Sequence, residues 1–88
     1  METLTMPSPA AHRTATFDRE LSRVRAMLDG QVLVSQDRCV DALLDLFNLA
    51  PGPLVRELLG EMLSDIRFVS AVRAELLRDD LSILRRYC

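Results

Sequence analysis

Residues 40–63, VDALLDLFNLAPGPLVRELLGEML, decide the fold. Before the prolines, apolar residues recur at the three- and four-residue spacing of an amphipathic α-helix. After them, apolar pairs recur four residues apart, which predicts a further helix with polar residues on its outer side. Pro53 suits the first position of that helix because proline has no N–H to leave unpaired there. So short a connection predicts that the two helices pack antiparallel.

Toward the N-terminus, the sequence predicts one more helix and a tail. Gly30 is a stop signal for that helix, and Ser35 is a suitable N-cap for the helix that contains residues 40–49. Residues 1–15 contain two prolines and show no apolar period, so we predict a flexible N-terminal tail followed by a helical bundle domain over residues 16–88. The first helix is predicted from apolar residues spaced by four, three and four: Phe17, Leu21, Val24 and Leu28.

Toward the C-terminus, Ser64 or Asp65 is expected to cap a fourth helix, and Asp79 or Asp80 is able to cap a last turn or two. A separate last helix and a continuous one both fit the pattern. No strand-like alternation or hairpin signal competes. The predicted fold class is all-α, a bundle of four to five short helices with a disordered N-terminal tail. The apolar residues of the expected fourth helix are Phe68, Val69, Val72, Leu76 and Leu77.

Composition and length limit the classes of protein to which this chain can belong. The chain has 88 residues, of which 49% are hydrophobic, and its mean hydropathy is +0.11. A chain this short has little interior in which to hide so many apolar side chains, so part of that surface is expected to need a partner. No stretch approaches the roughly 20 apolar residues of a membrane helix, and no secretory signal is visible. We therefore expect an intracellular protein, in the cytoplasm or nucleus, that uses no membrane.

The residue types that carry catalysis or bind metals are sparse. Asp37, Asp41 and Asp45 lie four residues apart and should line one helix face. We interpret this face as a solvated surface rather than as a cation site. The only histidine, His12, falls in the tail. Cys39 is interpreted as a small buried side chain, because no structured histidine is present to activate it. We expect no catalytic, cofactor-binding or metal-binding residues, no cofactor, and no enzyme activity.

The apolar excess gives the functional hypothesis. In the helix that contains residues 40–49, leucine and phenylalanine cover more of the helix circumference than a single apolar stripe would. The next helix has nearly as wide an apolar face. We expect a protein-binding module, either a homodimer or an adaptor or accessory subunit of a larger complex. Burial of this excess inside one bundle is an equally weighted alternative. The expected protein interface consists of Leu43, Leu46, Phe47, Leu49, Leu54, Leu58 and Met62.

The charge distribution supports one further hypothesis and weakens another. Residues 41–65 hold one arginine against five acids, a net charge of −4, whereas residues 66–88 hold five arginines against three acids, a net of +2. This acidic segment either pairs with the basic end inside the fold or meets a basic partner. Nucleic acid is disfavoured by the overall charge of −2 and the 5% aromatic content. The alternative function, a nucleic-acid-associated transcription regulator, would use a basic patch of Arg78, Arg85 and Arg86.

Two segments resemble known helical families. Residues 39–47 and 68–84 are similar in spacing to the N-terminal dimerisation segments of Rho-associated kinases, and equally to the harmonin-homology domains. Both resemblances imply a leucine-rich helical fold. Neither assigns a residue role, an activity or a partner to this chain.

Overall fold

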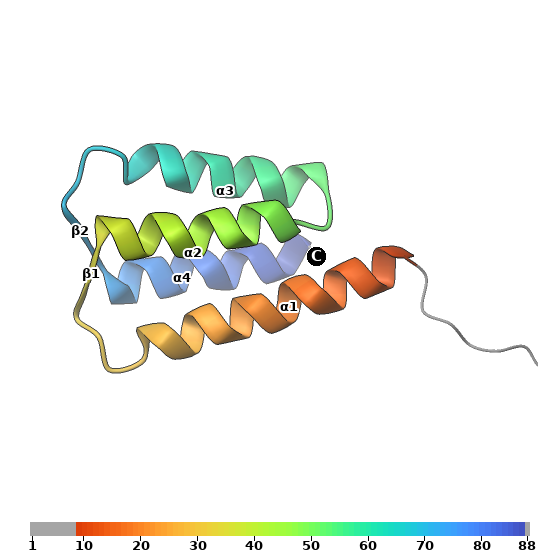
Figure 1. The fold of residues 1–88 in the computed structure, drawn as a ribbon, viewed down its shortest axis with the longest axis horizontal. Coiled ribbons are helices and arrows are strands. Elements are labelled where there is room, and N and C mark those ends of the chain that lie inside the picture. Colours follow the sequence, from red (N-terminus) through yellow and green to blue (C-terminus); the bar gives the residue numbers. More distant parts are fainter. Residues whose placement is uncertain (1–8, 88) are drawn as a thin grey trace, which may run out of the picture.

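The computed structural model describes residues 9–87, with side chains from residue 14 onward. Within this range the chain folds into four α-helices, which confirms the predicted all-α class (Figure 1). None of these helices is long and apolar enough to cross a membrane. The elements are α1 (Pro9–Leu28), β1 (Leu33–Ser35), α2 (Gln36–Leu49), α3 (Pro53–Asp65), β2 (Ala71–Arg73), α4 (Ala74–Leu84) and a 3₁₀ turn, η1 (Arg85–Tyr87).

The two short strands correct the expectation that the chain contains none. β1 and β2 pair antiparallel with Val34 opposite Val72, so each strand joins two helices and the ribbon closes one end of the bundle (Figure 1). The N–H of Gln36 donates to the carbonyl of Ser70 at 2.9 Å and extends the pairing by one step. Strands of three residues are too short to show an alternating pattern, and their pairing depends on two loops far apart in the sequence.

The hydrophobic core lies between the helices, with α2 in contact with both α1 and α3, and α1 in contact with α4. The four residues predicted for the apolar stripe of α1 are all buried, which confirms that stripe. α3 contributes only two fully buried side chains and is the least enclosed of the four helices. The core residues from the helices are Phe17, Leu21, Val24, Leu28, Cys39, Ala42, Leu43, Leu46, Val55, Leu59, Ala74, Leu77, Leu81 and Leu84.

Local signals fix the helix ends as predicted. The Ser35 hydroxyl accepts a hydrogen bond from the Arg38 N–H at 3.4 Å and caps α2. Pro53 occupies the first turn of α3 directly after the Pro51–Gly52 turn. α1 begins at Pro9, so residues 9–15 are helical, although the sequence pattern predicts a tail there; residues 1–8 lie outside the described residues.

Gly30 ends α1 in a conformation that other residues adopt only with strain. Its φ is +80°, in the left-handed region, and the Gln31 N–H bonds back to the Leu28 carbonyl at 3.0 Å. Gly30→Ala is expected to lower the free energy of unfolding by about 1 kcal/mol, because the added Cβ disfavours a positive φ. Urea denaturation followed by circular dichroism checks this. An unchanged midpoint would mean that the turn after α1 does not need this conformation.

The predicted start of the fourth helix is wrong. Asp65 is the last residue of α3 rather than a cap, and α4 begins at Ala74. Phe68 and Val69, placed in the helix by their spacing, instead lie in the α3–β2 loop, with Phe68 84% exposed. The chain turns at residues 66–68 and then enters β2, whose pairing with β1 is not visible in the helical pattern of one segment. At the other end, α4 passes through Asp79 and Asp80 without a break, so the last helix is continuous.

Candidate docking groove between α2 and α3

Two hollows lie along the α2–α3 pair. The one toward the strands has a volume of about 650 Å³ and lies next to Val40, Leu44 and Leu63. The one toward the α2–α3 turn has a volume of about 870 Å³ and lies next to Phe47 and Gly60. The two hollows occupy successive turns of the same two helices, since Phe47 follows Leu44 by three residues and Leu63 follows Gly60 by three. We call this surface, lined by these five residues, the α2/α3 groove.

The groove is open because Gly60 has no side chain. A Cβ built there meets only one neighbour, the Phe47 ring, at the ordinary contact distance of 3.8 Å. Leu44 is 42% exposed on the adjoining wall, while Val40, Phe47 and Leu63 are partly buried and pack against the core. The result is an apolar surface that the folded chain leaves partly in contact with water.

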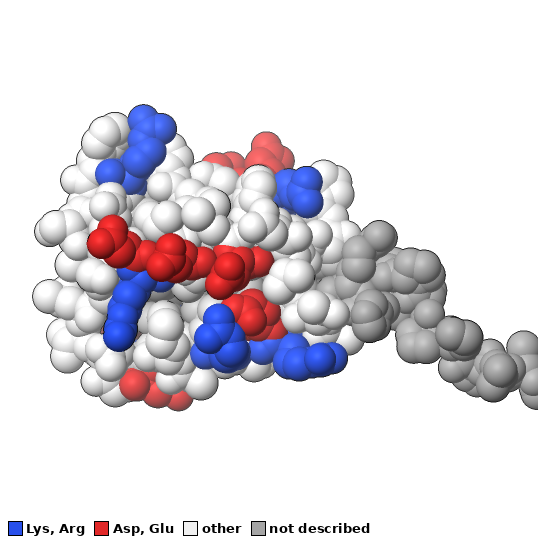
Figure 2. Space-filling view, in the orientation of Figure 1, with Lys and Arg blue, Asp and Glu red and all other residues white. Residues whose placement is uncertain are grey.

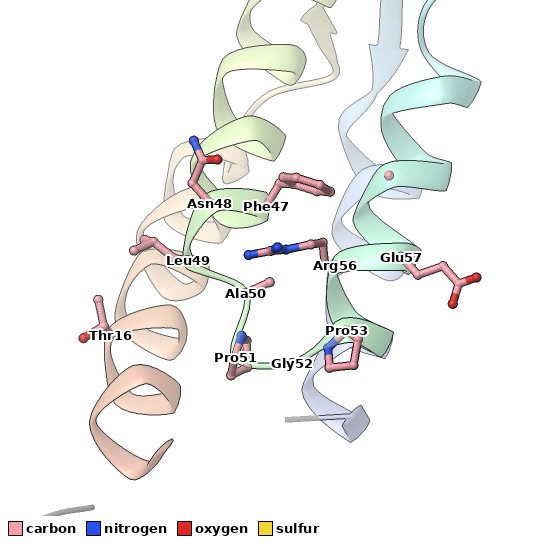
Figure 3. A pocket seen from close by; sticks show the side chains of 11 residues that line it. Thr16, Phe47, Asn48, Leu49, Ala50, Pro51, Gly52, Pro53, Arg56 and Glu57 are labelled. Atoms are coloured by element: carbon pink, nitrogen blue, oxygen red, sulfur yellow. The ribbon is translucent and has the colours of Figure 1, made fainter. Parts of the chain in front are cut away.

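At the turn end, one arginine reaches across the groove. The Arg56 guanidinium carbon from α3 lies 5.3 Å from the centre of the Phe47 ring on α2, a cation–π contact that fixes both side chains (Figure 3). Leu49 and Pro51 line the same hollow, and Thr16 approaches from α1 (Figure 3).

The two sides of the groove differ in charge. Asp37, Asp41 and Asp45 are all exposed, and Figure 2 shows acidic side chains in a row over α2. This confirms the prediction that the three share one helix face, and we call them the aspartate row. Across an uncharged strip, basic side chains lie over the two ends of α3, with acidic side chains between them (Figure 2). The sequence has Arg56 near the start of α3, Glu57 and Glu61 along it, and Arg67 just after its end.

The residues predicted for the protein interface do not lie on one surface. Leu43 and Leu46 are 0% exposed, so a partner that docks on the folded domain has no access to them. Phe47 and Leu49 line the turn end of the groove. Leu54 is 48% exposed near the start of α3. Their role as an interface stays a prediction, and the groove residues that the interface prediction missed are Val40, Leu44, Gly60 and Leu63.

The remaining two predicted interface residues, Leu58 and Met62, line a smaller cleft on the other side of α3. This α3/α4 cleft has a volume of about 170 Å³, and Ile83 lies on its α4 side. Three acids surround it: Glu61, Asp65 and Asp80. Partial burial raises the pKa of the Asp80 carboxyl, and the neighbouring charges of Asp79 and Asp65 raise it further.

Asp80 is therefore expected to destabilise the folded state when it is ionised. Its raised pKa means that the folded protein binds the proton more tightly than the unfolded chain, so this contribution to stability grows as pH falls. Asp80→Asn should raise the free energy of unfolding by about 0.5 kcal/mol at pH 7, a small value because the site is partly exposed. The difference from the unmodified protein should shrink at pH 3. Urea denaturation at both pH values measures it, and an equal difference at both would contradict this explanation.

The expected basic patch is largely engaged within the fold. Arg78 donates to the Leu28 carbonyl at 3.3 Å, and Arg85 donates to the Ser22 hydroxyl at 3.1 Å and lies 4.0 Å from Asp18. Both arginines therefore hold α4 against α1, while Arg86 is exposed. Arg78 lies within α4, whereas Arg85 and Arg86 follow its end, and Arg78 and Arg85 line one hollow beside α1.

The other residues considered for chemistry lie away from the groove. Cys39 is 0% exposed, its Sγ lies 3.8 Å from the Val34 carbonyl, and burial raises the pKa of its thiol. A buried thiol that holds its proton is a poor nucleophile. His12 lies outside the residues whose side chains are described. Within the described residues, no three histidine, cysteine or carboxylate side chains are grouped to hold a metal ion.

Further apolar side chains are exposed along the strand ribbon. Val32 and Leu33 lie at one end of the ribbon, and Phe68 and Val69 lie beyond its other end. Arg67 stacks on the Phe68 ring, with its guanidinium carbon 4.9 Å from the ring centre. We call these four residues the loop-end patch. It is not hollowed in the way that the α2/α3 groove is.

The fold and the groove define a small α-helical bundle with paired loops and an apolar, charge-flanked surface. No protein-family model, curated protein or solved structure matches this chain.

Proposed function

We propose that this domain is a protein-interaction module that takes one helix of a partner in the α2/α3 groove. The observation that carries the proposal is the exposed Leu44 at the strand-end hollow, one helical turn from the hollow over Gly60. An amphipathic helix buries side chains spaced by three or four residues in such a groove, and its anchors would contact Leu44, Phe47 and Leu63. The domain then acts as an adaptor or accessory subunit, and the proposal assigns no catalytic, metal or cofactor chemistry.

The dimensions of the groove fit one short helix. From residue 37 to residue 48, α2 rises about 16 Å, or three turns, so the occupant would contact the domain over a similar length. A surface this short buries less area than a standard stable complex, which favours a weak or transient partner. The hollow shape disfavours a second copy as occupant, because two copies joined at this face would place hollow against hollow and leave voids.

The proposal is tested by selecting partners from a randomised peptide library that favours helices. Peptides selected on the unmodified protein should lose binding to Gly60→Leu, which fills the hollow, and keep binding to Val32→Ser, a change at an exposed side chain that lines neither hollow. Circular dichroism of both variants shows that they are folded. Peptides that bind all three proteins equally, or a failure to select any peptide, would overturn the proposal.

Self-association is measured on the same samples by light scattering after size exclusion. A monomer is expected for the unmodified protein. A dimer that Gly60→Leu converts to a monomer would show that a second copy, rather than a partner's helix, occupies the groove, and would overturn the proposal in this form. The nucleic-acid alternative gains no support from the geometry of the arginines on α4.

A further inference from the structure

The charges beside the α2/α3 groove restrict the kind of helix that fits it. The three carboxylates of the aspartate row are spaced by four residues, so each lies about 6 Å from the next along α2. Together they form a line of negative charge about 12 Å long that runs parallel to the groove. A partner helix lying in the groove places one of its own flanks along this line, and residues four apart on that flank repeat at the same interval.

The fold itself does little to neutralise this line. Within the described residues, Asp37 and Asp41 form no ion pair, and Asp45 has only a long one, 4.0 Å from Arg23. Arg23 is more closely engaged with Glu20. Like charges four residues apart on a helix repel one another. A cation brought alongside by a partner relieves that repulsion.

The opposite side of the groove holds a cation near each end, with Glu57 beside the first of them. The Arg56 guanidinium lies over the Phe47 ring at the turn end, and the Arg67 guanidinium lies over the Phe68 ring at the strand end. A helix that is basic all round would meet these arginines with its second flank. The complementary helix therefore carries positive charge on one flank only.

We propose that the groove recognises an amphipathic helix with an apolar face and a single basic flank, whose lysines or arginines recur every four residues and face the aspartate row. This inference rests on the proposed function, since it names the partner chemistry of the same groove. The basic flank sets the direction in which the helix lies, because reversing the helix would place its cations against Arg56 and Arg67.

The test uses four synthetic helical peptides of about 18 residues, long enough to cover the groove. All share one leucine face. The first carries lysine on one flank and glutamine on the other; the second has glutamate, and the third glutamine, in place of those lysines; the fourth has lysine on both flanks. Each is labelled with a fluorophore, and binding is measured by fluorescence anisotropy at low and high salt.

For the unmodified protein, the one-flank lysine peptide should bind best. It should bind roughly tenfold more tightly than the glutamate peptide at low salt, with the glutamine peptide between them, and the difference should shrink at high salt. The peptide with lysine on both flanks should bind no more tightly than the one-flank peptide, despite its larger charge. Equal binding of the lysine and glutamate peptides, or tighter binding of the two-flank peptide, would overturn the inference.

Two triple variants with the same change in net charge locate the effect. Asp37→Asn, Asp41→Asn and Asp45→Asn together should abolish the preference for lysine. Glu61→Gln, Asp65→Asn and Asp80→Asn together, around the α3/α4 cleft, should leave it intact. Equal loss in both variants would show attraction to the overall charge and would overturn the inference. Loss in the second variant alone would do the same by placing the helix in the α3/α4 cleft.

The failure of this inference is distinguishable from failure of the proposed function. If all four peptides bind the unmodified protein equally and none binds Gly60→Leu, the groove takes a helix but the aspartate row does not select it. If Gly60→Leu binds every peptide as well as the unmodified protein does, the groove is not the site and both proposals fall.

Discussion

Leu43→Asn is expected to unfold the domain, whereas Leu44→Asn, one residue later, is expected to leave it folded. Leu43 is 0% exposed in the core, so asparagine there removes apolar packing. It also buries an amide that has no hydrogen-bond partner. The cost should be about 4 kcal/mol, a large part of the roughly 4–13 kcal/mol that stabilises a domain of this size. Leu44 is 42% exposed, and its replacement should cost less than about 1 kcal/mol.

The comparison between these two variants is well controlled. Both positions lie in the middle of α2, so the lower helix propensity of asparagine costs the same at each and cancels in the difference. Circular dichroism and thermal denaturation measure the folding of each variant. Leu44→Asn should then bind the one-flank lysine peptide several-fold more weakly while remaining folded. Equal destabilisation by the two changes would show that the buried and exposed sides of α2 are misassigned.

Gly60→Ala is expected to make the domain more stable and a weaker binder. Glycine inside a helix costs roughly 0.5–1 kcal/mol relative to alanine, and the added Cβ has open space beside the Phe47 ring. The midpoint of thermal unfolding should therefore rise by a few degrees. The same methyl group occupies part of the hollow that the partner's helix would fill. A gain in stability together with a loss of affinity separates this residue from one that merely supports the fold.

Gly52→Ala is the matched control for that change. Gly52 precedes α3 with an extended backbone, has open space around it, and lies outside the helical residues. Alanine there should give no comparable gain in stability, because no helical residue is improved. A loss of stability in Gly60→Ala would show that Phe47 lies closer to position 60 than the structure places it.

Much of the fold could be predicted because its signals are local. Gly30, Ser35 and Pro53 each mark a helix end through their own backbone or side-chain chemistry, and each is found in that role. The position of α2 in contact with two other helices follows from its unusually wide apolar coverage. The start of α4 could not be predicted, because β2, the segment directly before it, is held extended by pairing with β1 from the other half of the chain.

The site was predicted less well for a related reason. The spacing of Asp37, Asp41 and Asp45 fixes them on one helix face, whatever packs on the rest of α2. In contrast, Leu43 and Leu44 are chemically identical neighbours, and only the positions of α1 and α3 decide which one is buried. The hollow over Gly60 likewise depends on how α3 lies against α2, so no pattern within residues 53–65 predicts it.

The most direct test of the account is an NMR titration of the ¹⁵N-labelled domain with the one-flank lysine peptide. Binding in the α2/α3 groove predicts that the largest changes in amide chemical shift fall on Val40 to Phe47 and on Gly60 to Leu63. Changes confined to the loop-end patch, or to Ile83 and its neighbours beside the α3/α4 cleft, would contradict the claim that this groove is where the domain binds its partner.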